Sequence, residues 1–355
     1  MRYLIYCGPG IGDFVLILPM VQLLKRNDPS CYIQLFVCSS KERVSICNDL
    51  LKIQKYIDSI DYYSVKEIFH DIIFLVKMKY KKFDIGFSLQ YTNSKQTSCW
   101  PSRIINLCAK KTIGIRVDQK DGICYDKDVP LTQGTHVSEY PIMMCKKILG
   151  DSFIECDIDY SSLINKKVLS EYAKVNFANN KFISIVVGTA PVSGCLNNKY
   201  YQNSAKQWDY LNWVKLSKKL SNDGYDVVLL GGRKEEIEFS SFNDELKKFG
   251  IVNLLGKCEI LKSISILSSS LLAVGGDTGL MHCAGALNIP SLTLYGCTDY
   301  REYLPFGNKA NYMKSDCSCS PCFGTNNALT CNNHVCMKNI TVDSVYCRIK
   351  EILLK

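Results

Sequence analysis

The sequence lacks any long apolar run. No stretch of its 355 residues approaches the roughly eighteen uninterrupted apolar residues that a membrane-spanning helix needs. The apolar run within the first ten residues is too short for a secretory signal, and it leads into a glycine turn instead of a cleavage site. We therefore expect a cytoplasmic protein, or one that works at the inner face of the membrane.

The sequence also lacks a region of concentrated charge. Its formal charge is +9, but lysine and arginine are spread along the whole chain. Binding of nucleic acid usually requires a clustered basic stripe, so we expect no nucleic-acid partner. A spread positive surplus suits an acidic ligand, such as a phosphorylated substrate or a membrane surface. Hydrophobic residues at 47% and charged residues at 22% are ordinary for a globular protein.

Histidine is scarce and cysteine is abundant, with 4 and 19 residues. An odd number of cysteines, scattered through expected strands and helices, suits buried free thiols in a reducing compartment. One segment differs, because it gathers Cys317, Cys319, Cys322, Cys331, Cys336 and Cys347. This cysteine-rich segment, 317–347, needs its own explanation.

The length favours two domains, because a single hydrophobic core seldom grows beyond about 250 to 300 residues. In the first half, short apolar strands alternate with helices, which predicts βαβ units around a mostly parallel sheet. The expected strands are 2–6, 32–37, 83–89 and 111–115, and a helix is expected at 14–26.

The second half begins the same pattern again. Strands are expected at 181–187, 226–230, 271–274 and 291–295, and helices at 208–220, 261–268 and 280–287. These four strands end in glycine, and ligands bind at the carboxyl edge of parallel sheets. We place the linker between Glu155 and Asn180, around an Asn179-Asn180 turn. The prediction is an α/β protein with two doubly wound, Rossmann-like domains, 1–160 and 161–355, that face each other across a cleft.

The loop Gly8-Pro9-Gly10-Ile11-Gly12-Asp13 follows the first expected strand and opens a helix. A dinucleotide site would need a third glycine where Asp13 stands, and a carboxylate at a helix N-terminus repels a pyrophosphate. Two interpretations of Asp13 remain. It caps the helix, or it is a general base at the mouth of the cleft.

The motif Gly275-Gly276-Asp277-Thr278-Gly279 lies between an expected strand and an expected helix. The backbone N–H groups of Thr278 and Gly279, at a helix N-terminus, suit a diphosphate. Asp277 has the wrong charge for phosphate but can accept hydrogen bonds from sugar hydroxyls. His282 follows one helical turn later. The structural alternative is a capped helix that carries a core histidine.

Two more side chains of this half are candidates. Lys206 stands at an expected helix start, where a cation is unfavourable unless an anion binds there. Taken alone, it would be a solvated lysine. Glu235 follows Gly231-Gly232, and a carboxylate just past a strand end often binds ribose hydroxyls. Acidic residues favour the first turn of a helix in any case.

Taken in order, these motifs resemble the family 9 glycosyltransferases, the bacterial heptosyltransferases. The resemblance covers most of the chain. The matching pieces are Gly10-x-Gly12-Asp13 with Leu16 and Pro19, Gly188 with Lys206-x-Trp208, Gly231-Gly232-x-x-Glu235, Leu254-x-Gly256-Lys257, Gly276 to His282 with Ala284, and Pro290 with Leu294-x-Gly296-x-Thr298-Asp299.

The resemblance implies a GT-B fold whose terminal helix, about 341–354, packs back toward the first domain. It also implies inverting transfer of heptose or a related sugar from an ADP-sugar, with no cofactor required for the chemistry. Asp13 would be the catalytic base, with Gly10 and Gly12 in the acceptor-side loop, and Lys206 would stabilise the leaving ADP. The donor-binding residues would be Gly188, Thr189, Lys206, Glu235, Cys258, Asp277, Thr278, Gly279 and His282.

Within that set, each group has an expected partner. Lys206, Thr278 and Gly279 would hold the diphosphate. Asp277 would contact the sugar and Glu235 the ribose, and the loop Gly256-Lys257-Cys258 would contact the adenine. The family often has a larger apolar residue where Cys258 stands.

Two classes of acceptor fit the residues. An anionic glycan or lipid, such as a lipopolysaccharide core, would suit Lys77, Lys79, Lys81, Lys82 and Arg103. The alternative for the lysines of the 77–82 run is the solvated end of a helix. A protein acceptor would need no such patch. The insertion 191–205 is expected to be a polar and aromatic loop that shapes a sugar pocket.

Two other functions on this fold remain as alternatives. One is a sugar-nucleotide epimerase or hydrolase, against which stands the lack of further acid and base candidates beside Asp277. The other is a non-catalytic binding protein, against which stand the intact Asp13, Lys206 and Asp277.

The spacing Cys319-x-x-Cys322, followed by Cys331 and Cys336, suits a structural zinc or iron site. Two close pairs of thiolates across a short loop can complete a tetrahedral S₄ site. Four thiolates leave no open position for substrate, so the ion would be structural. Reduced thiols packed in a small loop are the alternative.

Overall fold

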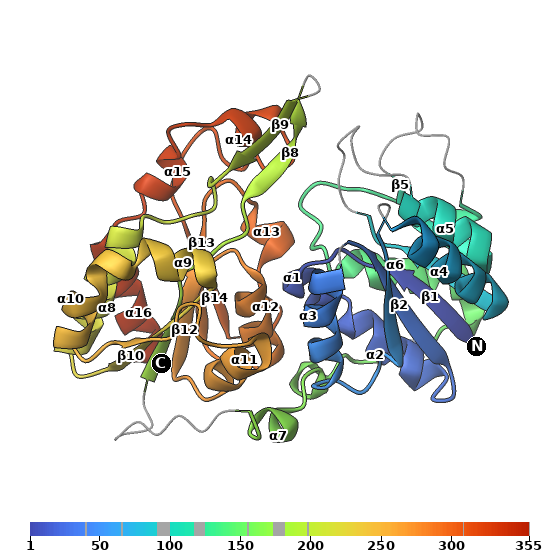
Figure 1. Cartoon of the computed structure of the whole chain (residues 1–355), viewed down its shortest axis with the longest axis horizontal. Helices are drawn as coiled ribbons and strands as arrows, with labels where there is room; N and C mark the ends of the chain where they lie inside the picture. Colours follow the sequence, from blue (N-terminus) through green and yellow to red (C-terminus); the bar gives the residue numbers. More distant parts are fainter. Residues whose placement is uncertain are drawn as a thin grey trace. The chain divides into compact units, whose positions relative to one another are not determined.

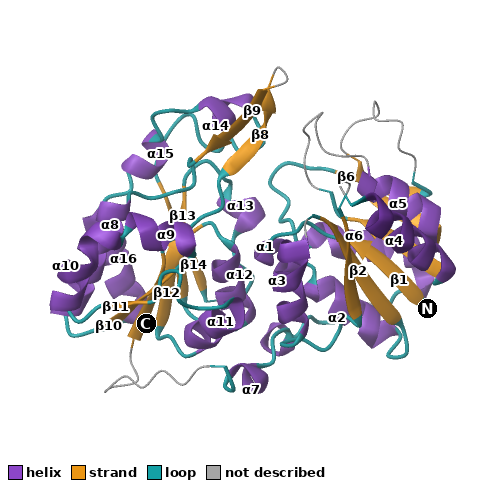
Figure 2. Cartoon of the chain, in the orientation of Figure 1, coloured by secondary structure: helices purple, strands orange, loops and turns teal. Residues whose placement is uncertain are grey.

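The computed structural model describes residues 1–39, 41–64, 67–90, 100–116, 125–154, 156–172, 182–196, 199–307 and 309–354. The chain divides into two compact units, Met1–Asn165 and Lys166–Lys355, whose elements are labelled in Figure 1. The sequence placed this boundary after residue 160. Each unit combines helices with a sheet, as Figure 2 shows, and the predicted α/β class is confirmed. The expected Asn179-Asn180 turn lies outside the described residues.

The first unit is built around a six-stranded sheet of order β3-β2-β1-β4-β5-β6, in which neighbouring strands are parallel. Its strands are β1 (Arg2–Tyr6), β2 (Tyr32–Cys38), β3 (Ser59–Tyr63), β4 (Phe83–Ser88), β5 (Ala109–Arg116) and β6 (Lys127–Pro130). Its helices are α1 (Ile11–Leu16), α2 (Leu18–Asn27), α3 (Lys41–Leu51), α4 (Ile68–Tyr80), α5 (Trp100–Cys108) and α6 (Glu139–Leu149). Two short 3₁₀ turns follow, at Gly150–Ser152 and Tyr160–Ser162.

Two details of the first unit differ from the prediction. The single helix expected at 14–26 is two helices, α1 and α2, because Pro19 lacks a backbone N–H and therefore favours the start of a new helix. Strands β3 and β6 were not predicted. Both lie at the edges of the sheet, where a strand does not need the continuous apolar run of a central strand.

The second unit repeats the topology. Its parallel sheet has the order β11-β10-β7-β12-β13-β14, which matches the first sheet strand for strand once the hairpin β8–β9 is set aside. The strands are β7 (Phe182–Val186), β8 (Val192–Leu196), β9 (Lys199–Asn203), β10 (Asp226–Leu230), β11 (Val252–Asn253), β12 (Leu272–Gly276), β13 (Ser291–Tyr295) and β14 (Ala310–Lys314). The helices are α7 (Lys166–Leu169), α8 (Tyr210–Asn222), α9 (Arg233–Glu238), α10 (Asn243–Lys248), α11 (Ile260–Ser268), α12 (Gly279–Ala286), α13 (Tyr300–Tyr303), α14 (Asn326–Thr330), α15 (Val335–Lys338) and α16 (Val342–Leu353), with a 3₁₀ turn at Ser240–Phe242.

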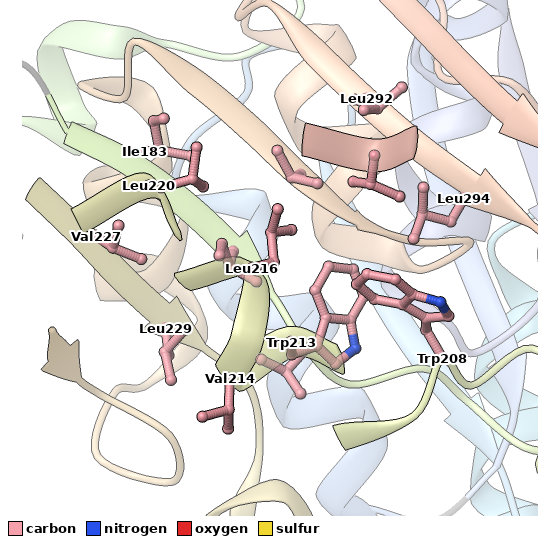
Figure 3. Packing of buried hydrophobic residues seen from close by; sticks show 14 of the residues in the cluster. Ile183, Trp208, Trp213, Val214, Leu216, Leu220, Val227, Leu229, Leu292 and Leu294 are labelled. Carbon is pink, nitrogen blue, oxygen red and sulfur yellow. The ribbon is translucent and has the colours of Figure 1, made fainter. Parts of the chain in front are cut away.

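The core of the second unit forms where α8 packs on the sheet. Figure 3 shows Trp208, Trp213 and Leu216 of this core, with Leu220 further along beside Ile183. The two indole rings meet edge to face, with centroids 4.6 Å apart, and Trp208 Nε1 donates a hydrogen bond to the Ile340 carbonyl at 2.8 Å. Helix α16 is the predicted terminal helix, and it packs on α8 within this unit. Its packing toward the first domain stays a prediction.

The insertion 191–205 was predicted to be a loop, and this was wrong. It forms an antiparallel hairpin of β8 and β9, which packs on α14. The partner that stabilises the hairpin lies more than a hundred positions further along the chain, so no local pattern reveals it. The Asn197-Asn198 pair lies outside the described residues. Among the described residues, no helix is long and apolar enough to cross a membrane.

Candidate functional site

In the second sheet, β10 and β11 follow β7 toward one edge, and β13 and β14 follow β12 toward the other. The topological switch point therefore lies between β7 and β12. Ligands of such sheets bind outside the carboxyl ends of the strands at this point. Val186 of β7 pairs with Gly275 of β12, so the two loops that follow leave the sheet side by side. A Cβ on Gly276 would come within 2.6 Å of Thr189 Cγ2, so these loops pack directly together.

Lys206, which is largely buried, and Asp277, which is fully buried, form an ion pair at the switch point. Lys206 Nζ lies 2.7 Å from Asp277 Oδ2, and the two side chains are 14% and 6% exposed. Lys206 was expected at a helix start, and this was wrong. Helix α8 begins later, at Tyr210, and Asp209 caps it. The charge of Lys206 is therefore balanced by Asp277 and is not opposed by a helix dipole.

Several groups act on the Asp277 carboxyl. Burial alone would raise its pKa, but the Lys206 ammonium, His282 and the Thr298 hydroxyl together hold the pKa below its ordinary value. His282 is buried on α12, with Nε2 3.9 Å from Asp277 Oδ1. Asp277 is therefore a carboxylate at neutral pH.

Two aromatic rings lie beside Lys206. Its Nζ is 4.5 Å from the ring centroid of Phe323 and 6.0 Å from that of Tyr303. Such cation–π contacts stabilise a partly desolvated ammonium. The sequence analysis missed both residues, because a single aromatic after Cys322, or one in the short helix α13, carries no characteristic spacing.

Helix α12 begins at the same edge of the sheet. Thr278 is its N-cap residue and has an extended backbone, and the first turn contains no acidic residue. The first N–H groups of a helix lack intrahelical partners and carry its positive end, which suits an anion. Thr278 and Gly279 thus lie at a helix N-terminus beside the Lys206–Asp277 pair.

Glu235 lies against the loop that follows β7. A Cβ on Gly188 would come within 2.6 Å of Glu235 Cδ, so this position needs glycine to admit the carboxylate. Glu235 Oε2 accepts a hydrogen bond from the Gly232 N–H at 2.8 Å and caps α9. The expectation that an acid in a first turn supports its own helix is confirmed, and ribose binding stays a prediction.

The turn after β11 carries Cys258. Gly256 has a φ of +67° there, in the left-handed region that glycine enters without strain. Cys258 is half-buried. Burial raises the pKa of its thiol, while Lys262 and Lys257 oppose this rise. Contact of this turn with adenine stays a prediction.

The first unit carries the other predicted motif, in the loop after β1. Asp13 Oδ2 accepts a hydrogen bond from the Gly10 N–H at 3.0 Å, which closes a capping box on α1, and Gly12 lies in the first turn of that helix. A Cβ on Gly8 would come within 2.3 Å of the same oxygen. The interpretation of Asp13 as a helix cap is confirmed, and its role as a general base stays a prediction.

The cysteine-rich segment brings several sulfur atoms near one another. Cys317 Sγ lies 3.0 Å from Cys319 Sγ, and Cys331 Sγ accepts the His334 N–H at 3.4 Å. Burial and then the nearby Cys322 raise the pKa of Cys336 to about 11. The described residues contain no group of three or more His, Cys, Asp or Glu side chains arranged to hold a metal ion. The site of Cys319, Cys322, Cys331 and Cys336 therefore stays a prediction.

The cysteine-rich segment is tied to the switch point through its backbone. The N–H groups of Cys322 and Phe323 both donate to the Cys297 carbonyl at 2.8 Å, and this turn sets Phe323 beside Lys206. On the other side, Asn203 at the end of β9 donates to the Cys331 carbonyl at 2.5 Å. The hairpin and the cysteine-rich segment thus form one support for the ring that contacts Lys206.

Comparisons with known proteins match this chain to one family of enzymes. Residues 171–332 match the sequence model of glycosyltransferase family 9 (heptosyltransferase). The chain is 32% identical over 134 residues to lipooligosaccharide heptosyltransferase 2 of Haemophilus influenzae, which covers 36% of this chain and 38% of that protein. Lipopolysaccharide heptosyltransferase 3 of Escherichia coli is 20% identical, over 83% of this chain and 82% of its own length. In three curated relatives that are 32% identical, the matched stretch covers only about a third of the relative's own length.

Solved structures match along the whole chain. The ADP-heptose lipopolysaccharide heptosyltransferase II of E. coli has a TM-score of 0.71 at 19% identity, over 100% of this chain and 99% of its own. E. coli heptosyltransferase WaaC, solved with ADP, has a TM-score of 0.72 at 17% identity, over 99% and 100%. The iron-containing dodecameric glycosyltransferase TibC of enterotoxigenic E. coli has a TM-score of 0.54 at 12% identity, over 100% and 78%. The fold is GT-B, as predicted, and residues 171–332 carry the sequence of glycosyltransferase family 9.

Proposed function

We propose that this chain transfers heptose from ADP-heptose to a hydroxyl group of an acceptor. One observation carries the proposal: Lys206 and the N-terminus of α12 converge at the switch point of the second sheet. Both offer positive charge at the place where a diphosphate would bind. The structures of a related heptosyltransferase with ADP and with ADP-2-deoxy-2-fluoro heptose support the choice of donor.

In this proposal the reaction inverts the anomeric carbon. The acceptor oxygen bonds to that carbon while the bond from the carbon to the β-phosphate oxygen breaks, and ADP leaves with its negative charge. Lys206 and the N–H groups of Thr278 and Gly279 stabilise this charge. Preorganised donors of this kind usually make the largest contribution to catalysis. Lys206 supplies charge that a divalent cation supplies in other transferases.

Asp277 holds Lys206 in place before the donor binds. An ammonium group has three N–H donors, so Lys206 can keep its bond to Asp277 Oδ2 while it donates to a phosphate oxygen. We assign the sugar hydroxyls to Asp277 and the ribose to Glu235. The loop from Gly188 to Thr189 and the turn that holds Cys258 would line the nucleotide.

We propose that Asp13 removes the proton from the acceptor hydroxyl. Asp13 stands in the motif Gly10-x-Gly12-Asp13 and follows β1, which is a switch-point strand of the first sheet. A carboxylate in this role takes the hydroxyl proton as the oxygen attacks. The acceptor that we propose is a lipopolysaccharide-type core, because the curated relatives are named lipopolysaccharide and lipooligosaccharide heptosyltransferases. The reaction would take place in the cytoplasm, at the inner face of the membrane.

Mass analysis of both substrates tests the proposal. The protein is incubated with ADP-heptose and a truncated lipopolysaccharide core, and we expect the core to gain one heptosyl residue as ADP accumulates. Free heptose, or an isomerised sugar nucleotide with an unchanged core, would indicate a hydrolase or an epimerase. An unchanged donor that is nevertheless bound would indicate a non-catalytic binding protein. Heptose attached to a protein instead of the core would show that the acceptor is a protein.

A further inference from the structure

Helix α4 (Ile68–Tyr80) presents an apolar face to solvent. Six of its side chains are between 54% and 85% exposed: Ile68, Phe69, Ile72, Ile73, Val76 and Tyr80. At 3.6 residues per turn, these six lie within an arc of about 140°. The other side of the helix carries the buried residues Asp71, Phe74 and Met78. We call the six exposed residues the outer face of α4.

The stability of the first unit does not explain the outer face. Phe74 and Met78 already attach α4 to the core, where they pack with Leu4 and Phe83. A surface helix normally places charged and polar residues on the side away from the core. Single exposed apolar residues are common, but a contiguous apolar face marks a site of interaction.

Basic residues accompany the outer face at the C-terminal end of α4. Lys77 and Lys79 lie in the last turn of the helix, and Lys81 and Lys82 follow directly. Lys79 is exposed and lies within the arc of the outer face. Lysine side chains beside an apolar surface extend their stems along it and keep the ammonium at its polar boundary.

The neighbouring helix α5 and the nearby acidic residues add to this pattern. Helix α5 packs beside α4 (Figure 1) and carries the exposed Trp100 and Arg103, with the guanidinium 5.8 Å from the indole centroid. Asp61 is paired with Lys77 at 2.7 Å, and Asp71 is buried and accepts the Ser64 N–H at 2.8 Å. An apolar helix face bordered by Lys, Arg and Trp is typical of helices that lie in a membrane interface.

We propose that the outer face of α4 binds the surface of an anionic phospholipid membrane. The apolar side chains enter the boundary between headgroups and acyl chains, and the exposed Lys79 and Lys82 lie at the headgroup phosphates. Lys77 keeps its pair with Asp61, and Lys81 keeps its bond to Gln34. A second copy of this chain, packed through its own outer face, is the alternative occupant that the test below distinguishes, and with the two helices parallel it would bring both sets of lysines together. The inference does not depend on heptosyl transfer, since it uses no residue of the switch point.

Co-sedimentation of the full chain with vesicles tests this surface. The vesicles contain phosphatidylglycerol and phosphatidylethanolamine, and vesicles of phosphatidylcholine alone provide the uncharged comparison. We expect binding to the anionic vesicles that weakens with salt. Phe69→Ser/Ile73→Ser should lower the partition coefficient by at least about ten-fold, since each side chain loses its burial in the interface. Lys79→Gln should lower it by about five-fold on anionic vesicles only.

Ile237→Ser is the matched control. Ile237 of α9 is 63% exposed, close to the 66% of Ile73, but it lies in the second unit, so its loss should leave vesicle binding unchanged. Because Phe69 and Ile73 are exposed, their variants should keep the thermal unfolding of the unaltered chain. Equal binding to both kinds of vesicle, or an equal loss with Ile237→Ser, overturns the proposal. It is also overturned if light scattering finds a dimer that Ile73→Ser dissociates while vesicle binding stays the same.

Discussion

The two units share one strand order but carry opposite charges at the switch points of their sheets. In the first unit, the helix after β1 holds Asp13 in its first turn, and this carboxylate binds the Gly10 N–H. In the second unit, α12 follows β12 without an acidic residue in its first turn, and Lys206 lies beside it. The fold supplies a sheet edge and a helix N-terminus in both cases. Side chains alone decide whether that edge suits an anion.

This difference divides the proposed tasks. A phosphate at the loop after β1 would meet a carboxylate that already uses the positive end of α1, so anion binding there is unfavourable. A phosphate at the switch point of the second sheet would meet an ammonium and unpaired helix N–H groups. The same topology therefore suits a proton acceptor in one unit and a nucleotide diphosphate in the other.

Asp13→Asn should have the largest effect and tests the first unit's side of the comparison. The amide oxygen can still accept the Gly10 N–H, but the side chain can no longer take a proton. We expect turnover to fall by roughly two to four orders of magnitude in steady-state kinetics, the range for loss of a general base. Asp209→Asn, at the cap of α8, is the control and should leave turnover unchanged. Wild-type turnover in Asp13→Asn would reduce Asp13 to a helix cap.

Lys206→Ala tests the second unit's side through stability. It leaves the buried Asp277 without its cation, and breaking one side of a buried ion pair typically costs about 3–5 kcal/mol of the free energy of unfolding. Lys206→Ala/Asp277→Ala should recover part of this loss, because no buried charge is left unpaired. Urea unfolding measures both variants. A double variant that is as unstable as the single one would contradict the account.

The pH dependence of the same two proteins sharpens this test. The pKa of Asp277 is lowered in the folded chain, below the value of about 3.9 of an unfolded aspartate. The pair therefore stabilises the fold fully above about pH 4, and this contribution is lost as the pH falls through the folded value. In Lys206→Ala the carboxyl of Asp277 stays buried but loses its nearest cation, so burial should raise the pKa of Asp277. The free energy of unfolding of the variant should then fall, relative to the wild type, as pH rises above about 4. If the free energies of unfolding of the wild type and Lys206→Ala, measured in urea, changed in parallel from pH 4 to 8, the ion pair would contribute nothing to stability.

Loss of a metal ion from the cysteine-rich segment should have a smaller effect on ADP binding by the second unit. If Cys319, Cys322, Cys331 and Cys336 hold an ion, elemental analysis of protein purified without chelator should find about one equivalent of zinc or iron per chain. Removal of this ion should weaken ADP binding by no more than about five-fold, because the segment acts on the site only through Phe323. Less than about 0.2 equivalents, with all thiols titratable in the folded protein, would exclude the ion.

Phe323→Leu should have an effect that is similarly small. It removes the ring beside Lys206 but keeps an apolar side chain, and a cation–π contact of about 1 kcal/mol corresponds to about a five-fold weaker affinity for ADP. Phe249→Leu is the matched control, because the Phe249 ring centroid lies 4.8 Å from Lys218 Nζ, away from the switch point. An equal change of ADP affinity in both variants would remove Phe323 from the site.

The central strands and the motifs at their ends could be predicted from the sequence for a physical reason. Strands such as β1 and β7 are buried on both faces and therefore read as continuous apolar runs. Their glycine ends identify the carboxyl edge of the sheet, so the loops of Asp13 and Asp277 could be placed near ligand-binding edges.

The remaining features depend on contacts between distant parts of the chain. Lys206 and Asp277 are 71 positions apart, and only the pairing of β7 with β12 brings their loops together. The hairpin β8–β9 depends on α14, and Phe323 depends on hydrogen bonds to the Cys297 carbonyl. Local spacing contains none of these partners, so the sequence predicted a solvated or helix-start lysine and a loop.

Titration calorimetry of ADP into three proteins tests the central claim most directly. We predict that the wild type and Asp13→Asn bind ADP with the same affinity, and that Lys206→Ala binds it at least about ten-fold more weakly, as expected for the loss of a charge-assisted hydrogen bond. ADP should also bind more tightly than UDP or GDP. Unchanged ADP affinity in Lys206→Ala, or preference for UDP or GDP, would contradict an ADP-sugar site at the switch point of the second sheet.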